Sequence, residues 1–324
     1  MGSRHQLLHD VEQCVDAIID KVGKTVVIGL PLGLGKPVEL VNALYARAKA
    51  DTTLELRILT ALSLEIPEGS SPLERAFLGP FIKRVYGDCP QLDYMRDLRK
   101  QALPENVSVS EFFFKPGSFM NNPAAQQAYI SSNYTHAARD VFEQGCNVAA
   151  QSLCMREQNG QTRLSLSCNP DTGPELVEML RTAEAAGERK VCVVGQVNQN
   201  LPYMGHDAEV EPDVFDFILD NEQYYKSLFS TPKLSVATAD YMIGLNASAL
   251  IKDGGTLQIG IGALGDAIVH AAKLRHSHNP DYLQVLSDTG IARQAAELIE
   301  QIGGTGAFEK GLYGATEMFV DGFL

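Results

Sequence analysis

Apolar residues near the N-terminus recur every three or four positions, which predicts an amphipathic helix with one buried stripe. The stripe consists of Leu7, Val11, Cys14, Ile18 and Val22. The period then changes: a β-branched run at 25–30 predicts a strand, a glycine-rich turn follows at 31–37, and 38–50 has helical spacing. Pro37 suits the first turn of that helix, where a missing N–H costs nothing. Strand, glycine turn and helix in this order are typical of an α/β domain.

The same order of elements recurs along the chain. Further strands are expected at 54–64, 146–154, 162–168 and 190–198, and a helix at 174–187. The run 191–194 is apolar on both faces, as a strand inside a parallel sheet must be. The stretch 65–135 contains seven prolines, and we expect helices and loops there that lie over the sheet. The pattern therefore predicts an α/β fold with helices on a mostly parallel sheet.

An acidic, turn-rich segment at 200–235 predicts a boundary, so we expect an N-terminal α/β domain over 1–220 and a second one over 230–324. In the second domain the pattern predicts helices at 239–251, 266–276 and 294–304, and strands at 256–260, 282–288 and near 318–324. No helix follows the last strand, although a parallel sheet needs cover on both faces. We therefore expect the second domain to be incomplete, the first part of a C-terminal α/β domain.

The composition is that of an ordinary globular protein, with 45% apolar and 21% charged residues. A length of 324 residues favours two domains. No apolar run is long enough to span a bilayer, and the N-terminus lacks the apolar core of a signal peptide. We therefore expect a cytoplasmic protein without a membrane partner. The six cysteines form no C-x-x-C pair and are expected to be reduced packing residues.

The net charge of −13 argues against a nucleic-acid partner, because phosphate binding needs clustered lysines and arginines. No stretch has five basic residues together. A substrate with phosphates would have to be held by backbone amides and a few local cations.

A glycine motif, Gly260-x-Gly262-x-x-Gly265, stands between a predicted strand and a predicted helix and matches the dinucleotide fingerprint. Asp266 places a negative charge where a pyrophosphate would lie, and Asp288 comes later than the usual acidic position. Three alternatives stay open: an NAD site, a turn that only joins strand to helix, and a loop that lets another ligand approach the backbone.

The segment 29–37 resembles a phosphate loop but departs from its spacing. Five residues rather than four separate Gly29 from Gly35, and Pro37 replaces the Ser or Thr that would hold Mg²⁺. The segment can still be a glycine turn that admits a ligand.

Other candidate motifs are weaker. The run 275–278 has alternating histidines, and we expect a solvated loop there and no metal site. His206 is a candidate base, but a lone loop histidine is more often structural. No G-x-S-x-G elbow exists, so an esterase-type serine has no support.

Glu317 lies in an unusual context close to the C-terminus. Gly311 and Gly314 leave the backbone open before it, and the apolar run 318–320 follows it. A carboxylate that is partly stripped of water is a better nucleophile, because water no longer stabilises its charge. The simpler interpretation is an exposed glutamate after a turn, and the residues alone leave both open.

Together these segments resemble the acetyl-CoA hydrolase/CoA-transferase family, which includes butyrate, 4-hydroxybutyrate and succinyl-CoA:acetate CoA-transferases. The matching stretches are VVIGLPLGLGKPVEL, SLSCNPDTGPE, KVCVVGQVNQNLP, DYMIGLNASALIKDGGTLQIGIGALGDAIV and TEMFVDG. The resemblance covers most of the chain and is faint between 65 and 135. It implies a CoA-transferase-like fold with two α/β domains.

The resemblance assigns roles to two segments. The active-site glutamate of the family maps onto Glu317. The family's coenzyme A loop maps onto Gly260, Ile261, Gly262, Ala263 and Leu264. Two features depart from the family pattern: 52 residues separate Gly265 from Glu317, more than in the common short members, and family members continue past this glutamate. The substrate is therefore left open, and we expect residues 1–324 alone to be inactive.

The resemblance implies an acyl-CoA:carboxylate CoA-transferase or an acyl-CoA (acetyl-CoA) hydrolase that acts through a glutamyl-CoA thioester, with a place in acetate metabolism. Coenzyme A would be a substrate, and no permanently bound cofactor and no metal would be needed. Acyl-CoA and small carboxylates would be the partners, and the protein would form a homo-oligomer, a dimer. Two rival hypotheses stay open: an NAD-dependent oxidoreductase that uses the Gly260–Gly265 loop, and a non-catalytic CoA-binding module.

Overall fold

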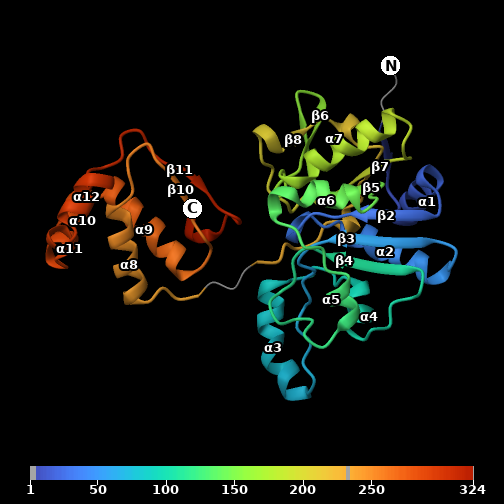
Figure 1. Cartoon of the computed structure of the whole chain (residues 1–324), viewed down its shortest axis with the longest axis horizontal. Coiled ribbons are helices and arrows are strands. Elements are labelled where there is room, and N and C mark those ends of the chain that lie inside the picture. The colour runs from blue at the N-terminus through green and yellow to red at the C-terminus, as the bar shows by residue number, and fades with distance from the viewer. Residues whose placement is uncertain (1–4, 231–233, 324) are drawn as a thin grey trace. The chain divides into compact units, whose positions relative to one another are not determined.

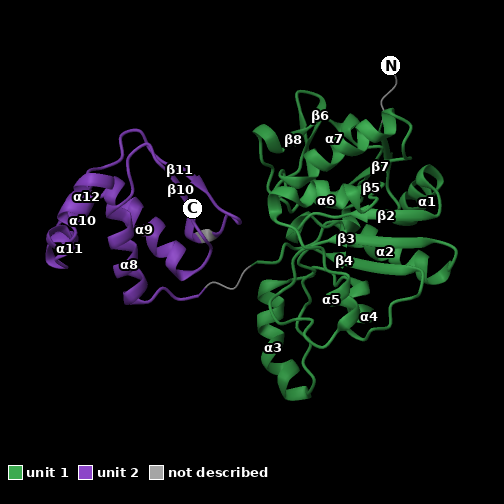
Figure 2. Cartoon of the chain, viewed as in Figure 1, with its two compact units in different colours: residues 1–230 green, residues 231–324 purple. Residues whose placement is uncertain are grey.

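The computed structural model describes residues 5–230 and 234–323. The chain divides into two compact units, residues 1–230 (unit 1) and 231–324 (unit 2), as Figure 2 shows. The predicted boundary segment includes residues 231–233, which lie outside the described part. Unit 1 is built around a large sheet, whereas unit 2 is mainly helical.

Within its described residues, unit 1 has seven parallel strands and two short antiparallel additions. The seven are β1 (Gln6–Leu8), β2 (Thr25–Gly29), β3 (Glu55–Thr60), β4 (Val107–Glu111), β5 (Val148–Gln158), β7 (Cys192–Val197) and β9 (Phe217–Leu219). Their order is β1-β9-β7-β5-β2-β3-β4, and every neighbouring pair runs parallel. β6 (Gln161–Ser165) pairs antiparallel with the end of β5, and β8 (Glu209–Val210) pairs with β6. The predicted α/β fold with a mostly parallel sheet is confirmed.

Helices cover both faces of this sheet, because its central strands are apolar on both sides (Figure 1). On one face pack α1 (Val11–Val22), α2 (Val38–Ala50), α4 (Asp93–Arg99) and α5 (Pro123–Gln127). On the other face pack α6 (Ala137–Glu143) and α7 (Thr172–Ala185). α3 (Pro72–Val85) is largely exposed. Short 3-10 turns are η1 (Gly33–Gly35), η2 (Tyr134–His136), η3 (His206–Ala208), η4 (Pro212–Val214), η5 (Glu222–Tyr224) and η6 (Asp321–Phe323).

Two expectations for unit 1 need correction. Leu7 belongs to β1 and not to the first helix, which begins at Val11. Asp10 ends the extended segment, because its side chain accepts a hydrogen bond from Gln13 N at 2.9 Å and so caps the helix. The stretch 65–135 contains more than helices and loops, since β4 forms the edge strand of the sheet there.

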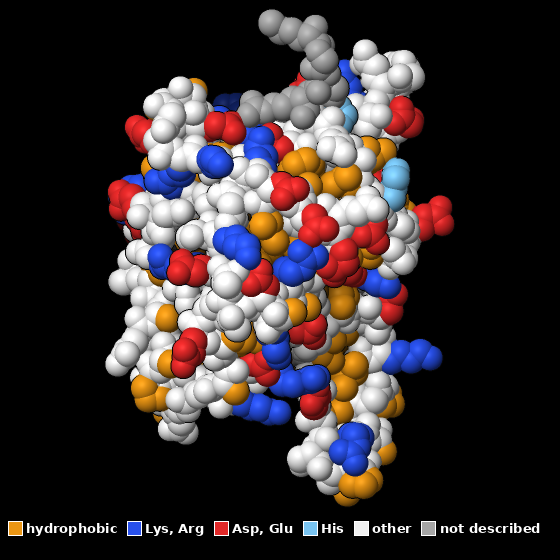
Figure 3. Space-filling view, turned by 90° about the vertical axis from the view of Figure 1, so that its right-hand side faces the viewer, with side chains coloured by type: hydrophobic (Ala, Val, Ile, Leu, Met, Phe, Trp, Pro, Cys, Tyr) orange, Lys and Arg blue, Asp and Glu red, His pale blue; other side chains and the backbone are white. Residues whose placement is uncertain are grey.

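Surface charges of unit 1 lie beside charges of the opposite sign. Lys24 Nζ lies 2.9 Å from Asp51 Oδ2, and the Arg47 guanidinium lies 2.6 Å from Asp16 and 3.0 Å from Glu12. On the face that Figure 3 shows, Lys and Arg side chains are interspersed with Asp and Glu. That face therefore carries mixed charge, while the absence of a nucleic-acid partner stays a prediction.

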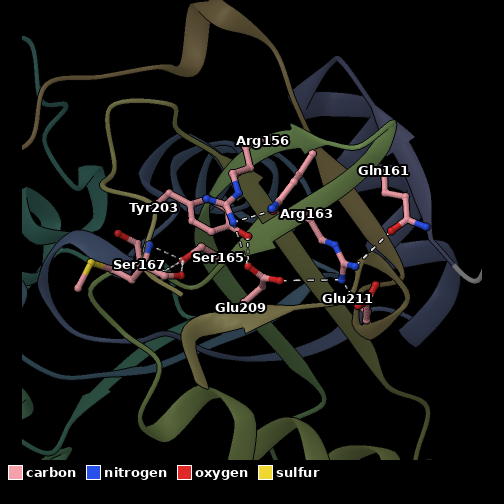
Figure 4. A network of polar contacts seen from close by, with 10 residues as sticks. Arg156, Gln161, Arg163, Ser165, Ser167, Tyr203, Glu209 and Glu211 are labelled. Carbon is pink, nitrogen blue, oxygen red and sulfur yellow. Dashed lines mark hydrogen bonds and ion pairs between the residues drawn. The ribbon is translucent and has the colours of Figure 1, made fainter. Parts of the chain in front are cut away.

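A polar network ties the β5–β6 hairpin to the segment before β8 (Figure 4). The guanidinium carbon of Arg156 lies 3.6 Å from the centre of the Tyr203 ring, and the Tyr203 hydroxyl donates to Glu209 at 2.6 Å. Burial and this hydrogen bond raise the pKa of Tyr203 to about 12. Arg163 approaches the same carboxylate from β6. Each contact joins two parts of the fold, so we interpret the network as structural.

Unit 2 combines helices with a pair of short strands. The helices are α8 (Thr238–Ala249), α9 (Ala263–Ser277), α10 (Asn279–Asp288), α11 (Ile291–Gln294) and α12 (Ala296–Ile302), and the strands are β10 (Thr256–Gln258) and β11 (Tyr313–Ala315). Its core consists of Ala249, Tyr282, Leu286, Ile291 and Ile299. The strand predicted at 282–288 is wrong, because α10 occupies it. Tyr282 and Leu286 are four residues apart, a helical spacing that a short apolar run does not distinguish from a strand.

The strand expected near 318–324 lies earlier, as β11, and η6 follows it; Leu324 is outside the described residues. The solvated loop expected at 275–278 is also wrong in part, because α9 extends to Ser277. Arg275 is buried and donates to Gly306 O, Ser248 O and Ile251 O at 2.7–2.8 Å. The carbonyls, rather than water, satisfy this guanidinium.

Candidate active site

The two strands of unit 2 run parallel, so both end at the same edge of the small sheet. Gln258 pairs with Ala315, and Ile259 N donates to Ala315 O at 2.9 Å. The predicted coenzyme A loop, Gly260–Leu264, begins two residues after β10, and Glu317 stands two residues after β11. The pairing therefore brings the predicted loop and the predicted nucleophile to one edge. Ligands of parallel sheets bind at the carboxyl ends of the strands, which is this edge.

The shape of the loop depends on its glycines. Gly262 has a φ of 118°, a conformation that strains any residue with a side chain. Among the described residues, apart from the chain neighbours of each glycine, no heavy atom lies within 4 Å of the position that a Cβ on Gly260 or Gly262 would take, so the space beside them is open. A Cβ on Gly265 would lie 1.9 Å from Gly260 O, so only glycine lets the loop fold onto the first turn of α9. Ile261 is exposed beside these open positions.

Glu317 lies in a turn at the surface of unit 2. Thr316 Oγ1 donates to Met318 O at 3.0 Å and so closes the turn across the glutamate. The side chains of Glu317 and Phe319 are both exposed. In this chain the carboxylate is therefore not stripped of water, because the turn leaves Phe319 at the surface instead of packing it over Glu317; the role of Glu317 stays a prediction.

The chain after Glu317 returns to α9. A Cβ on Gly322 would lie 1.9 Å from Asp266 Oδ1, so the two segments are in close contact. The same oxygen of Asp266 is buried and has no hydrogen-bond partner in the described part of the chain. The turn with Glu317 is thus held between β11 on one side and the first turn of α9 on the other.

The dinucleotide hypothesis lacks a strand directly after the glycine-capped helix, since the next strand, β11, follows only after three more helices. A Rossmann unit needs a strand after the glycine-capped helix, with an acidic residue at the end of that strand. Here α9 is followed by another helix, α10, and Asp288 is the last residue of that helix. Asp266 also places negative charge at the start of α9, where a pyrophosphate would have to bind. The geometry therefore disfavours an NAD site.

Other sequence candidates do not assemble into a site. Among residues 5–230 and 234–323, no group of three or more His, Cys, Asp or Glu side chains is placed to hold a metal ion. His206 is exposed in η3, and His276 and His278 are exposed at the end of α9. All six cysteines, which lie in the described part of the chain, are free, and Cys168 alone among them is exposed.

A buried lysine in the glycine turn of unit 1 had no signal in the sequence. Lys36 Nζ donates to Pro31 O at 2.8 Å and to Ala61 O at 2.7 Å. Burial lowers the pKa of Lys36 to about 8, although the nearby charge of Glu111 opposes this shift. The ammonium joins the segments that follow β2 and β3. It holds the turn together, so the turn does not use this lysine as a phosphate loop would.

Two further carboxylates of unit 1 are shielded from water: Glu111 is buried, and Glu39 is half-buried. Glu111 accepts a hydrogen bond from Ser63 N at 3.1 Å, and Glu39 accepts one from Gln196 Nε2 at 2.6 Å. Burial raises the pKa of both carboxyl groups. Glu39 and Gln196 are 157 residues apart in sequence, so no local pattern could have paired them.

No family model matches the chain. Among curated proteins it is similar to the 4-hydroxybutyrate coenzyme A transferase of Clostridium kluyveri, with 36% identity over 84 residues. The match covers 26% of this chain and 19% of that protein. The chain resembles the CoA-transferases. The match confirms the resemblance that the motifs indicated.

Solved structures show that the fold is shared with RipA. The crystal structure of RipA from Yersinia pestis aligns with a TM-score of 0.52 and 17% identity, covering 96% of this chain and 68% of that chain. A single-residue mutant of RipA aligns with a TM-score of 0.57 and 16% identity, covering 96% and 67%. In the described part of this chain, no helix has the length and apolar character to cross a membrane.

Proposed function

We propose that this chain carries the coenzyme A loop and the nucleophile of an acyl-CoA:carboxylate CoA-transferase. The observation that carries the proposal is the parallel pairing of β10 with β11, which places Gly260–Leu264 and Glu317 at one sheet edge. The similarity to a 4-hydroxybutyrate coenzyme A transferase supports the reaction class. Acyl-CoA and a small carboxylate are the proposed substrates, and a homo-oligomeric enzyme stays a prediction.

Glu317 acts as the nucleophile in this proposal. A carboxylate oxygen attacks the thioester carbonyl, the C–S bond breaks, and an acyl-glutamyl anhydride and the CoA thiolate form. The thiolate then attacks the glutamyl carbonyl, which releases the first carboxylate and leaves a glutamyl-CoA thioester. A second carboxylate then attacks the glutamyl-CoA thioester, which releases the CoA thiolate and forms a new anhydride. The thiolate attacks the acyl carbonyl of this anhydride, so a new acyl-CoA leaves and Glu317 is free again. The reaction involves no oxidation or reduction, and none of these steps requires a metal ion.

The exposed position of Glu317 suits this chemistry, because a carboxylate that must attack a large thioester needs an open approach. The open space beside Gly260 and Gly262 admits the pantetheine end of the coenzyme close to the backbone. Backbone N–H groups of the loop can then stabilise the oxyanion that forms at the thioester, an effect worth roughly 3–4 kcal/mol for each donor. Binding of the remote nucleotide can offset strain at the reacting carbonyl.

A hydrolase differs from a transferase only in the acceptor. If water attacks the glutamyl-CoA thioester, the products are coenzyme A and the free enzyme; if a carboxylate attacks, a new acyl-CoA forms. Product analysis with and without an acceptor carboxylate separates the two, since only a transferase depends on the acceptor for turnover.

Trapping the covalent intermediate tests the proposal. The full-length enzyme is incubated with acyl-CoA and no acceptor carboxylate. It is then digested with trypsin, and the peptides are analysed by mass spectrometry. Trypsin cleaves after Lys310, so a glutamyl-CoA adduct is expected on the peptide that begins at Gly311. Glu317→Gln should lose adduct and turnover, because a neutral amide cannot form the anhydride. Glu309→Gln, an exposed glutamate close by, is the matched control and should keep both. Wild-type turnover in the Glu317→Gln enzyme, or a label on another peptide, would reject Glu317 as the nucleophile.

A further inference from the structure

Unit 1 contains an apolar cavity of about 240 Å³ between its sheet and the helices α6 and α7. Figure 1 shows these two helices lying together over the sheet. The walls come from the ends of β2 and β4, from β5 and β7, from both helices and from the segment before β9. They include Phe112, Ala138, Val141, Leu166, Leu176 and Phe215. None of these residues takes part in the proposed transferase chemistry of unit 2.

The cavity lies on the face of the sheet that α6 and α7 cover, beside the place where the strand order reverses. β2 is followed by β3 on one side, while β5 joins β2 on the other, so the chain changes direction between β2 and β5. In open α/β sheets, ligands bind outside the carboxyl ends of strands at such a switch point. Gly29, Leu30 and Pro31, at the carboxyl end of β2, line the cavity together with Ala149, the second residue of β5, so the cavity reaches the switch point from the β2 side.

Small side chains keep this space open. Ala137, Ala138 and Ala149 line the cavity, and a larger residue at any of these positions would occupy part of it. Gly29 lines it as well, but the space beside Gly29 is already packed, because a Cβ there would lie 3.0 Å from Leu176 Cδ2. Protein interiors are normally packed with few voids larger than a water molecule. A cavity of this size is therefore unusual, and we ask which ligand it could bind.

The polar groups of the wall do not offer a binding site for a charged ligand. The buried amide of Gln151 is committed to Asn169 O at 2.8 Å and to Leu166 O at 3.4 Å. The exposed carboxylate of Glu178 lies on α7 at the rim, and none of the described lining residues is a Lys, Arg or His. An anionic head group would therefore meet one negative charge and no cation.

We propose that this cavity binds a neutral aliphatic chain. An apolar cavity of about 150 Å³ is known to take benzene, so a cavity of 240 Å³ accommodates a chain on the order of eight to ten carbons. The apolar wall excludes polar and charged groups from the interior, and Glu178 disfavours a free carboxylate at the rim. The ligand class is thus an aliphatic alcohol or ester rather than a fatty acid anion.

Calorimetric titration with 1-octanol tests the proposal. We expect saturable binding of one 1-octanol per chain, and at least fivefold weaker binding of octanoate at neutral pH. Ala138→Leu and Ala149→Leu place extra methyl groups in the cavity and should each weaken 1-octanol at least tenfold. Ala124→Leu, on the exposed surface of α5, is the matched control and should bind as the wild type does.

The outcomes decide the proposal in either direction. No saturable binding of 1-octanol to the wild type overturns it, and so does equal affinity in the wild type and both filled variants. Tighter binding of octanoate than of 1-octanol overturns the assignment of a neutral ligand. Circular dichroism checks that each variant is folded; if Ala138→Leu does not fold, the smaller Ala149→Val provides the same test. Transferase assays are not involved, so the result is independent of the proposed function of unit 2.

Discussion

Replacing Lys36 by methionine tests whether a buried charge shapes the stability of unit 1. Lys36 is 5% exposed, and its ammonium donates to Pro31 O and Ala61 O. Burial lowers the pKa of Lys36 from 10.5 to about 8, while Glu111 limits the shift. Methionine keeps an unbranched side chain of similar length but carries no proton that titrates.

The sign and size of the effect follow from this pKa. Between about pH 8 and pH 10.5 the unfolded chain holds a proton at Lys36 that the folded chain has lost, so stability rises with pH in this window. One pKa unit corresponds to about 1.4 kcal/mol. From about pH 7 to pH 9.5 the wild type should therefore gain about 2 kcal/mol that the Lys36→Met variant does not gain.

Urea unfolding followed by circular dichroism measures this difference. With an m value of about 3 kcal/mol per M, the unfolding midpoint of the wild type should rise by about 0.7 M relative to the variant between the two pH values. Lys24→Met, which removes an exposed lysine of the same unit, should show the wild-type pH dependence. Measurements stop at about pH 9.5, before ordinary tyrosines lose their protons. If the unfolding midpoints of the wild type and Lys36→Met change in parallel with pH, burial does not lower the pKa of Lys36, and the reasoning fails.

Three further predictions concern other parts of the chain. Arg275→Leu should destabilise unit 2 by about 3 kcal/mol, because buried carbonyls lose their donor, and faster hydrogen exchange of core amides in unit 2 but not in unit 1 would show it. Gly265→Ala should lower the melting temperature of unit 2 because its Cβ has no room, whereas Gly306→Ala, with open space around it, should not; equal melting temperatures would contradict the loop geometry. Cys168 should be the first thiol to react with a thiol reagent in the native protein, and a fast reaction that persists in Cys168→Ser would count against the burial of the other cysteines.

The sequence by itself determined the elements whose signal is local. Helical spacing at 38–50 corresponds to α2, and the apolar run at 191–194 corresponds to the first half of β7, because side-chain period and two-sided burial show in neighbouring residues. The α/β class follows from the repetition of these signals. The loop Gly260–Leu264 and Glu317 were also recognised from short motifs, although their roles stay predictions.

The tertiary structure alone decided which distant residues meet. β4 lies in a proline-rich stretch and became a strand because β3 offered it a partner, while 282–288 became a helix because its apolar residues face the core of unit 2. The pairing of β10 with β11 joins residues more than fifty positions apart. The burial of Lys36 and the cavity under α6 and α7 likewise depend on several elements at once. Propensity and periodicity describe one segment at a time, whereas pairing, burial and enclosed space arise only when segments pack against one another.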